Sequence, residues 1–190
     1  MQTRKQELLD GLIDYLVRHG PSDLSLRPMA AEIGTSARLL IFHFQSKEQL
    51  LIAVLEEMQA RLRRSLAALQ AAKETRKPVP LLKVFWQWAT AEETFGYLSL
   101  YYRLHILAVQ SQGAFAPYLE RNAQNWLQAI QAALPESRRS PAFATLLGAV
   151  FDGLFIELMS TGDRKRTTAA LDQFLQLAAR PVATDRRAAR

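Results

Sequence analysis

The sequence predicts an all-α fold, and three observations support this class. Apolar residues recur every three or four positions in the longer segments, which is the spacing of one helical face. No segment alternates apolar and polar residues as a strand would, and no glycine-rich nucleotide loop is present. Helix-breaking residues stand at Gly20, Gly34, Pro80, Gly113, Pro135, Pro141 and Gly162. Together with further helix starts at about Lys47 and Thr94, these breaks divide the chain into about nine helices.

Composition restricts the class of protein further. With 190 residues, 49% of them hydrophobic, the chain can bury one or two compact cores. It has no cysteine, which excludes a disulfide framework and a thiolate metal site. The N-terminus has no apolar signal-peptide core, and Asp152 and Glu157 interrupt the longest candidate membrane span. We therefore expect a soluble, cytoplasmic protein without a membrane partner.

The first helix is expected from about Gln2 to His19. Its apolar stripe consists of Leu8, Leu9, Leu12, Ile13, Leu16 and Val17. Gly20 and Pro21 end it. The stripe would cover the two short helices that follow.

Residues 23–51 predict these two short helices. Ser25 can cap a helix that begins at Leu26, and Pro28 lies in its first turn, where a missing N–H costs no hydrogen bond. This helix should end at about Ile33. Gly34 can then adopt the left-handed conformation that ends helices.

A second short helix should follow after a tight turn. Thr35 and Ser36 can cap it, and it should reach about His43. The turn of about three to four residues is typical of a helix-turn-helix. Ser46 and Gln49 then form a capping box for a long helix from Lys47 to about Ala72.

In a helix-turn-helix, the first residues of the second helix face the base edges of DNA. Arg38 is the strongest candidate, because a guanidinium can bind guanine O6 and N7 with about 1 to 3 kcal/mol of discrimination. His43 and Lys47 could bind phosphate. The alternative is that Arg38 is an ordinary solvated arginine. The complete predicted DNA-binding set is Arg27, Thr35, Ser36, Ala37, Arg38, Leu39, Phe42, His43 and Lys47.

One run of motifs identifies a family resemblance. The motifs are Ile33-Gly34-Thr35-Ser36, Leu40, His43-Phe44, Ser46-Lys47 and Leu50-Leu51. They resemble the DNA-binding domain of the tetracycline-repressor (TetR) family of bacterial transcription regulators. Two positions depart from that pattern: Ile41 stands where most members carry a phosphate-binding tyrosine, and Leu39 replaces a commoner threonine. The tyrosine contact therefore cannot be transferred to this chain.

The formal net charge of +6 suits an anionic partner, but its distribution weakens that argument. Up to Leu50 the numbers of basic and acidic residues are equal, and the excess of cations lies further along, including the arginine-rich end of the chain. The placement of individual cations in the motif is therefore more informative than the net charge.

The segment from Lys73 to Pro80 is polar and ends in prolines, and it predicts a loop. Further helices are expected at about 80–91, 94–109, 117–134, 141–160 and 165–179. We divide the chain into a DNA-binding domain, 1–46, and a helical ligand-binding and dimerisation domain, 47–190. In this interpretation the long helix that begins at Lys47 joins the two.

Aromatic residues are concentrated in the second part and exceed what packing alone requires. An apolar cavity with a few polar groups is typical of a small-molecule site, and the family resemblance implies an effector in the same region. The alternative is that each aromatic fills the core, and His105 could be a satisfied core histidine. The predicted lining residues are Trp86, Tyr101, Tyr102, His105, Trp126 and Phe155.

The last two helices predict a dimer interface. The helix over 141–160 is apolar around much of its circumference, and Gly148 and Gly153 would allow close approach of another helix. With the last helix it could complete a four-helix bundle with a second subunit, as the resemblance also implies. The alternative is burial of both helices within one subunit. Asp152 must find water or a partner there, because a buried lone carboxylate is costly.

The predicted function is a ligand-responsive transcriptional regulator, a repressor that binds a near-palindromic DNA operator as a homodimer. The alternative is a helical adaptor on the same scaffold without sequence-specific DNA binding. No enzyme is expected, because His19, His43 and His105 are the only histidines and no catalytic constellation accompanies them. No cofactor or metal is expected. The effector is an unidentified small molecule.

Overall fold

A computed structural model of the chain describes residues 3–21, 24–73, 80–111 and 113–179. Those residues form helices without any strand, which confirms the all-α class. The α-helices are α1 (Arg4–His19), α2 (Leu26–Glu32), α3 (Ala37–Phe44), α4 (Lys47–Lys73), α5 (Leu81–Ala89), α6 (Glu92–Ser111), α7 (Ala116–Ala132), α8 (Pro141–Thr161) and α9 (Arg164–Ala179). Short 3-10 helices cover Gly113–Phe115 and Glu136–Arg138.

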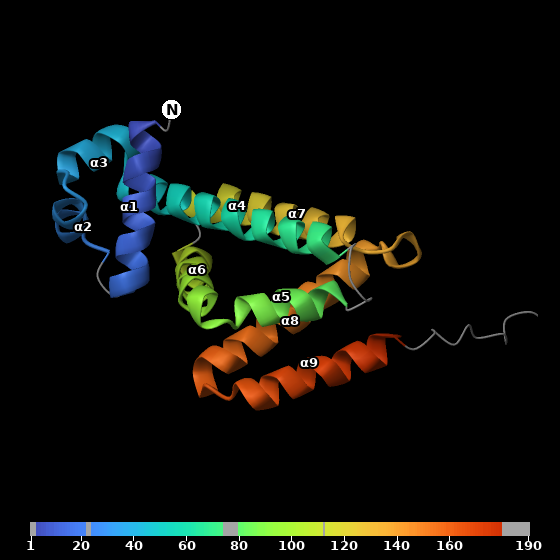
Figure 1. Cartoon of the computed structure of the whole chain (residues 1–190). Coiled ribbons are helices and arrows are strands. Elements are labelled where there is room, and N and C mark those ends of the chain that lie inside the picture. The colour runs from blue at the N-terminus through green and yellow to red at the C-terminus, as the bar shows by residue number, and fades with distance from the viewer. Residues whose placement is uncertain (1–2, 22–23, 74–79, 112, 180–190) are drawn as a thin grey trace, which may run out of the picture.

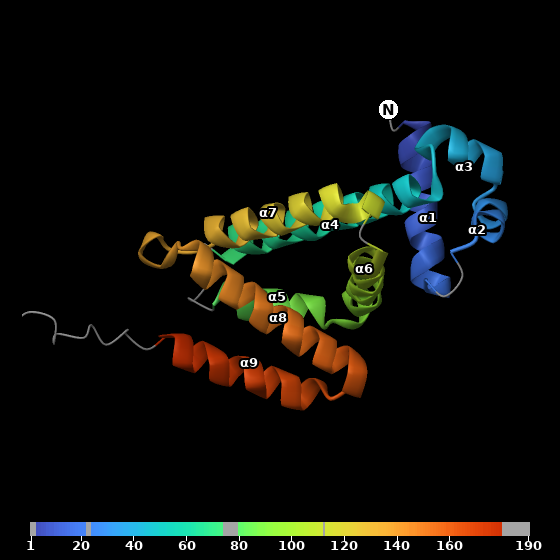
Figure 2. The ribbon, with the colours of Figure 1, turned by 180° about the vertical axis from the view of Figure 1, so that it is seen from behind.

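The helices α1, α2 and α3 form a small unit at one end of the molecule (Figure 1). The long helix α4 leaves this unit and extends to the far end, with α7 beside it in both views (Figures 1 and 2). The helices α8 and α9 pack against each other on the side away from α4. The α4 helix therefore belongs to both halves of the molecule.

One hydrophobic core runs through both halves. In the small unit, Leu12 of α1, Met29 of α2 and Leu40 of α3 are fully buried. The α4 helix contributes Leu50 to this end and Leu62 further along. Because the apolar stripe of α4 continues without a break, the two halves share packing rather than meeting through a flexible linker.

The predicted turn between α2 and α3 forms as expected. Gly34 has a φ of 67°, and the Ser36 hydroxyl accepts a 3.1 Å hydrogen bond from the N–H of Leu39. The Ser46 hydroxyl likewise accepts from the N–H of Gln49 at 3.1 Å, which caps α4. Ser25 stands at the N-cap of α2, but its side chain makes no capping hydrogen bond, so that prediction was wrong in its detail.

The other helix boundaries agree with the sequence analysis to within about two residues, which is the usual uncertainty of helix ends. The predicted start of the first helix at Gln2 lies outside the described residues. So do the interior of the loop between Lys73 and Pro80 and the arginine-rich end of the chain.

Helix α8 is more apolar than the sequence analysis allowed. Among the described residues it alone has the length and composition of a membrane span, with a mean hydropathy of 1.7 over eighteen residues. The carboxylates of Asp152 and Glu157 do not interrupt such an average, so that argument against a span was too strict. Only 22% of this window is buried, and core helices of soluble proteins meet the same criterion. Burial within the single chain therefore does not account for most of the apolar surface of α8.

Candidate DNA-binding surface and ligand cavity

Helix α3 presents one face to the protein and the other to solvent. Leu40 and Phe44 are buried against the small unit, and Ile41 and Phe42 between them are exposed. Phe42 is 77% exposed, the most of any large hydrophobic side chain that the structure describes, and its ring meets that of His43 edge-on at 5.3 Å. An exposed helix of this kind, held by a buried face, can enter the major groove.

The predicted DNA-binding residues lie around this exposed face. Arg27, Ser36, Arg38, Phe42 and Lys47 are exposed, whereas Thr35, Ala37, Leu39 and His43 are partly buried. The Ser36 hydroxyl accepts the capping bond and keeps its own proton free to donate to a phosphate.

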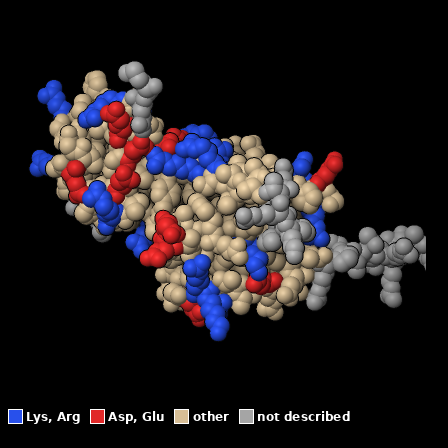
Figure 3. Space-filling model, in the orientation of Figure 1, with Lys and Arg blue, Asp and Glu red and all other residues tan. Residues whose placement is uncertain are grey.

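The cations of this face are available to an anionic partner. Within the described ranges, no carboxylate forms an ion pair with Arg27, Arg38 or Lys47. Figure 3 shows that basic and acidic side chains are interspersed over the end formed by α1 to α3, rather than gathered into one basic face. Individual cations, as expected from the sequence, must therefore provide any phosphate contacts.

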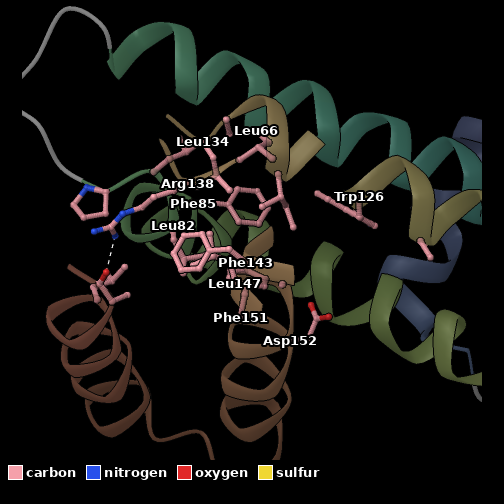
Figure 4. Close-up of a pocket in the computed structure, with 18 of the residues that line it drawn as sticks. Leu66, Leu82, Phe85, Trp126, Leu134, Arg138, Phe143, Leu147, Phe151 and Asp152 are labelled. Carbon is pink, nitrogen blue, oxygen red and sulfur yellow. Dashed lines mark hydrogen bonds between the residues drawn. The ribbon is translucent and has the colours of Figure 1, made fainter. Parts of the chain in front are cut away.

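The second half contains a cavity of about 570 Å³ between α4, α5, α6, α7, α8 and α9. Its wall is mainly apolar and aromatic, with Phe85, Trp126, Phe143 and Phe151 among the residues in Figure 4. This volume lies within the usual range of about 300 to 1,000 Å³ for small-molecule sites.

The exposed second helix lies in a segment that matches a known family. Residues 8–54 match the model of the bacterial regulatory proteins of the tetR family. These residues therefore carry a DNA-binding unit of the TetR family. The HTH-type transcriptional regulator BetI of Brucella anthropi is 23% identical over 171 residues, 88% of this chain and 88% of BetI. The resemblance identified in the sequence is thereby confirmed, and the protein is a transcriptional regulator.

Solved structures of known proteins share the whole fold. A TetR-family member from Streptomyces coelicolor A3 matches with a TM-score of 0.67 at 25% identity, covering 90% of this chain and 98% of that one. The multidrug binding protein EbrR complexed with imidazole matches with a TM-score of 0.68 at 24% identity, covering 98% of this chain and 99% of EbrR. The similarity thus includes the second half as well as the DNA-binding unit.

Four of the six aromatic and histidine residues predicted to line the cavity lie in its wall: Tyr101, Tyr102, His105 and Trp126. Trp86 and Phe155 do not. Trp86 is 1% exposed, and its indole N–H donates to the Thr168 hydroxyl at 2.9 Å, which ties α5 to α9. Phe155 is fully buried in the core beside Trp86.

Several lining residues of the cavity were not predicted from the sequence. They are mainly apolar side chains of α5, α7 and α8, together with one basic and one acidic residue: Phe85, Leu134, Arg138, Phe143, Leu147, Phe151 and Asp152. Helical spacing assigns Phe85 and Phe151 to apolar faces, but it cannot distinguish a face against the core from a face against a cavity.

A hydrogen-bonded network joins the cavity to α4. The Tyr101 hydroxyl donates to Asn122 Oδ1 at 2.6 Å and accepts from the Trp126 indole N–H at 3.2 Å. Gln59 of α4 donates its side-chain amide to the carbonyl oxygen of Asn122 at 3.0 Å. Burial raises the pKa of Tyr101, so its phenol stays protonated and keeps donating.

Two other polar groups of the cavity are only partly satisfied. Asp152 is exposed in the single chain, but its carboxylate accepts a 2.5 Å hydrogen bond from the Tyr102 hydroxyl, and partial desolvation raises the pKa of Asp152. His105 Nδ1 is buried and finds no hydrogen-bond partner among the described residues. Burial lowers the pKa of His105, which favours a neutral ring at pH 7. Among the described residues, no group of three His, Asp or Glu side chains could hold a metal ion.

Proposed function

We propose that this TetR-family regulator is a ligand-responsive repressor of the cytoplasm that binds a near-palindromic operator as a homodimer. Residues 1–46 would form the DNA-binding domain, and residues 47–190 the ligand-binding and dimerisation domain. One observation carries the proposal. The single helix α4 begins at Lys47 on the DNA-facing side and reaches the cavity wall at Leu66.

Ligand response is supported by the cavity and by a structural relative. The relative EbrR is a multidrug binding protein whose complexes with imidazole, ethidium and proflavin are known. The corresponding half of this chain holds a cavity of suitable volume with few polar groups. A small molecule in this cavity would contact α4, α6 and α8 together.

Dimerisation through α8 and α9 is supported by their exposed apolar residues. Leu146 and Ile156 of α8 are 48% and 42% exposed, and Leu177 of α9 is 54% exposed. A second copy of the same face would bury these residues in a four-helix bundle. It would also provide the second recognition helix that a near-palindromic operator requires.

Coupling between ligand and DNA would follow from the two-fold arrangement. The two recognition helices must reach successive major grooves, with centres about 34 to 36 Å apart or a multiple of that distance. A ligand that prefers another separation weakens DNA binding by its difference in affinity for the two states, typically about 1 to 3 kcal/mol. Helix α6 lines the cavity and contacts α1, so it could transmit such a change.

In vitro selection of random duplex DNA by the purified protein tests this function, with the stoichiometry of the complex measured by light scattering. We expect a near-palindromic site bound by two subunits, or by four if two dimers share it. Recovery of no preferred sequence, with binding abolished by excess nonspecific DNA, would contradict the repressor and favour the adaptor alternative.

A further inference from the structure

We propose that the cavity of this regulator binds an organic cation whose positively charged nitrogen lies against Asp152 and whose flat apolar body lies among the aromatic walls. The inference rests on the proposed function, in which the cavity holds the effector. It adds the chemical class of that effector.

The two charged residues that line the cavity lie at opposite ends of it. Figure 4 shows Arg138 at the end near α9 and Asp152 at the other end. The Arg138 guanidinium donates to the carbonyl oxygen of Ala178 at 2.6 Å and lies over the Phe143 ring, 5.9 Å from its centre. Arg138 thus has a carbonyl acceptor and an aromatic ring as partners at one end of the cavity, whereas Asp152 at the other end has one neutral donor.

Asp152 has no compensating positive charge. Among the described residues its hydrogen-bond partner is the neutral hydroxyl of Tyr102, at 2.5 Å, and no lysine or arginine there forms an ion pair with it. An ionised carboxylate has about four acceptor sites, so a single donor leaves most of them unused. The desolvation that raises the pKa of Asp152 is the cost that a bound cation would offset.

The surroundings of Asp152 suit a cation with an aromatic body. The rings of Tyr101, Tyr102 and Trp126 line the same cavity, and aromatic faces attract cations. The neutral ring of His105 would not repel a cation, and its unpartnered Nδ1 can exchange a hydrogen bond with a ligand nitrogen. An anionic ligand would instead meet an uncompensated carboxylate.

A salt bridge across the dimer is the competing role for Asp152. Residues 147, 151, 155 and 158 belong to the buried stripe of α8, and Asp152 lies beside that stripe and is exposed in the single chain. Because Asp152 both lines the cavity and accepts from Tyr102 of α6, it is directed to the ligand side of this boundary. The two roles predict different effects of removing the charge.

The test uses three acridines with the same ring system and different charges at neutral pH. These are 9-aminoacridine, a cation; acridine, which is neutral; and acridine-9-carboxylate, an anion. Their affinities for the full-length protein can be measured by quenching of tryptophan fluorescence, because Trp126 is in the cavity wall. We expect 9-aminoacridine to bind at least about tenfold more tightly than acridine, since a hydrogen bond to a charged group contributes about 1.5 to 3 kcal/mol.

Two matched variants locate the effect. Asp152→Asn keeps an oxygen that can accept from Tyr102 and should remove the preference for 9-aminoacridine, leaving the affinity for acridine unchanged. Glu157→Gln, on the same helix and paired with Arg166 at 2.6 Å outside the cavity, should keep the preference. Circular dichroism would check that both variants fold.

Equal affinity for acridine and 9-aminoacridine, tighter binding of the anion, or binding of none of the three by the unmodified protein would overturn the inference. A preference that survives in Asp152→Asn would also do so. If that variant instead loses dimerisation and keeps its ligand affinities, the carboxylate pairs across the dimer. The proposed regulatory function is tested separately, because the selection of DNA sequences does not involve an acridine.

Discussion

At the scale of single residues, Arg38 is the clearest candidate for base recognition. It is exposed near the start of α3 and pairs with no described carboxylate. We expect Arg38→Ala to relax base preference at one position in each half-site, with a loss of about 1 to 3 kcal/mol of discrimination. Repeating the DNA selection with the variant measures this, and an unchanged preference profile would remove Arg38 from base recognition.

Lys47 provides the matched comparison, because it lies at the start of α4, where phosphate contacts are expected. Lys47→Ala should weaken binding to all sequences alike and lower the slope of log affinity against log salt by about one. Titrations of one specific and one unrelated duplex at several salt concentrations measure both quantities. A loss confined to particular base pairs would contradict the phosphate assignment.

Asp152 should reduce the stability of the ligand-free protein. Its pKa is raised in the folded state, so the folded protein binds this proton more tightly than the unfolded chain does. The cost is therefore present at neutral pH and disappears as pH falls below the ordinary aspartate pKa of about 3.9.

Asp152→Asn should consequently raise the Tm at neutral pH, by no more than about 2 °C because the side chain remains solvent-accessible in the single chain. The difference between the two proteins should shrink in acid. Thermal unfolding followed by circular dichroism at several pH values measures it. A Tm that falls at neutral pH would mean that the charge itself stabilises the fold.

At the scale of helices, the first residue after α3 is strained. Gln45 has φ 71° and ψ −49°, and the N–H of Ser46 donates to the carbonyl of Phe44 at 2.9 Å, which closes a γ-turn. Residues other than glycine rarely adopt a positive φ. This turn sets the direction in which α4 leaves α3.

Gln45→Gly should relieve this strain and raise the Tm by about 1 to 3 °C, because removing a strained positive φ gains on the order of 1 kcal/mol before the entropy of glycine is subtracted. Gln49→Gly, inside α4, is the opposite control and should lower the Tm. An equal decrease in both variants would show that Gln45 is not strained.

The helices themselves were largely predictable, because their signals are local. Ser36, Gly34 and Ser46 act through hydrogen bonds and φ values within a few residues, and each marks a boundary that the structure contains. Ser25 occupies the N-cap position of α2 without the capping hydrogen bond. A local sequence signal thus predicts where a helix begins, but not which hydrogen bond its cap residue forms.

At the scale of the whole molecule, the apolar face of α8 and α9 should be the dimer interface. The double variant Leu146→Glu and Ile156→Glu places charges on that face and should convert the dimer to a monomer, since an unpaired buried charge costs several kcal/mol. Sedimentation measures the oligomeric state, and DNA binding should weaken in parallel. Ile106→Glu, at a similarly exposed position on α6, should leave the dimer intact.

The choice of aromatic residues that line the cavity also depends on the packing of the whole molecule. Tyr101, Tyr102 and Trp126 line it, whereas Trp86, equally aromatic and equally regular in its helical spacing, lies in the core. The difference arises because Trp86 meets Thr168 from α9, 82 positions away in the sequence. No local pattern contains that contact.

The sequence by itself determined the all-α class, most helix boundaries and the helix-turn-helix, because capping, glycine conformation and apolar periodicity act over a few residues. Its motifs also carried the resemblance to the TetR family. The tertiary structure alone decided which aromatics face a cavity, that Arg138 closes one of its ends, and that Asp152 lies at the other against Tyr102. Those facts depend on how α6, α7, α8 and α9 pack. Packing angles between distant helices are set by the sum of many weak contacts, which no single stretch of sequence records.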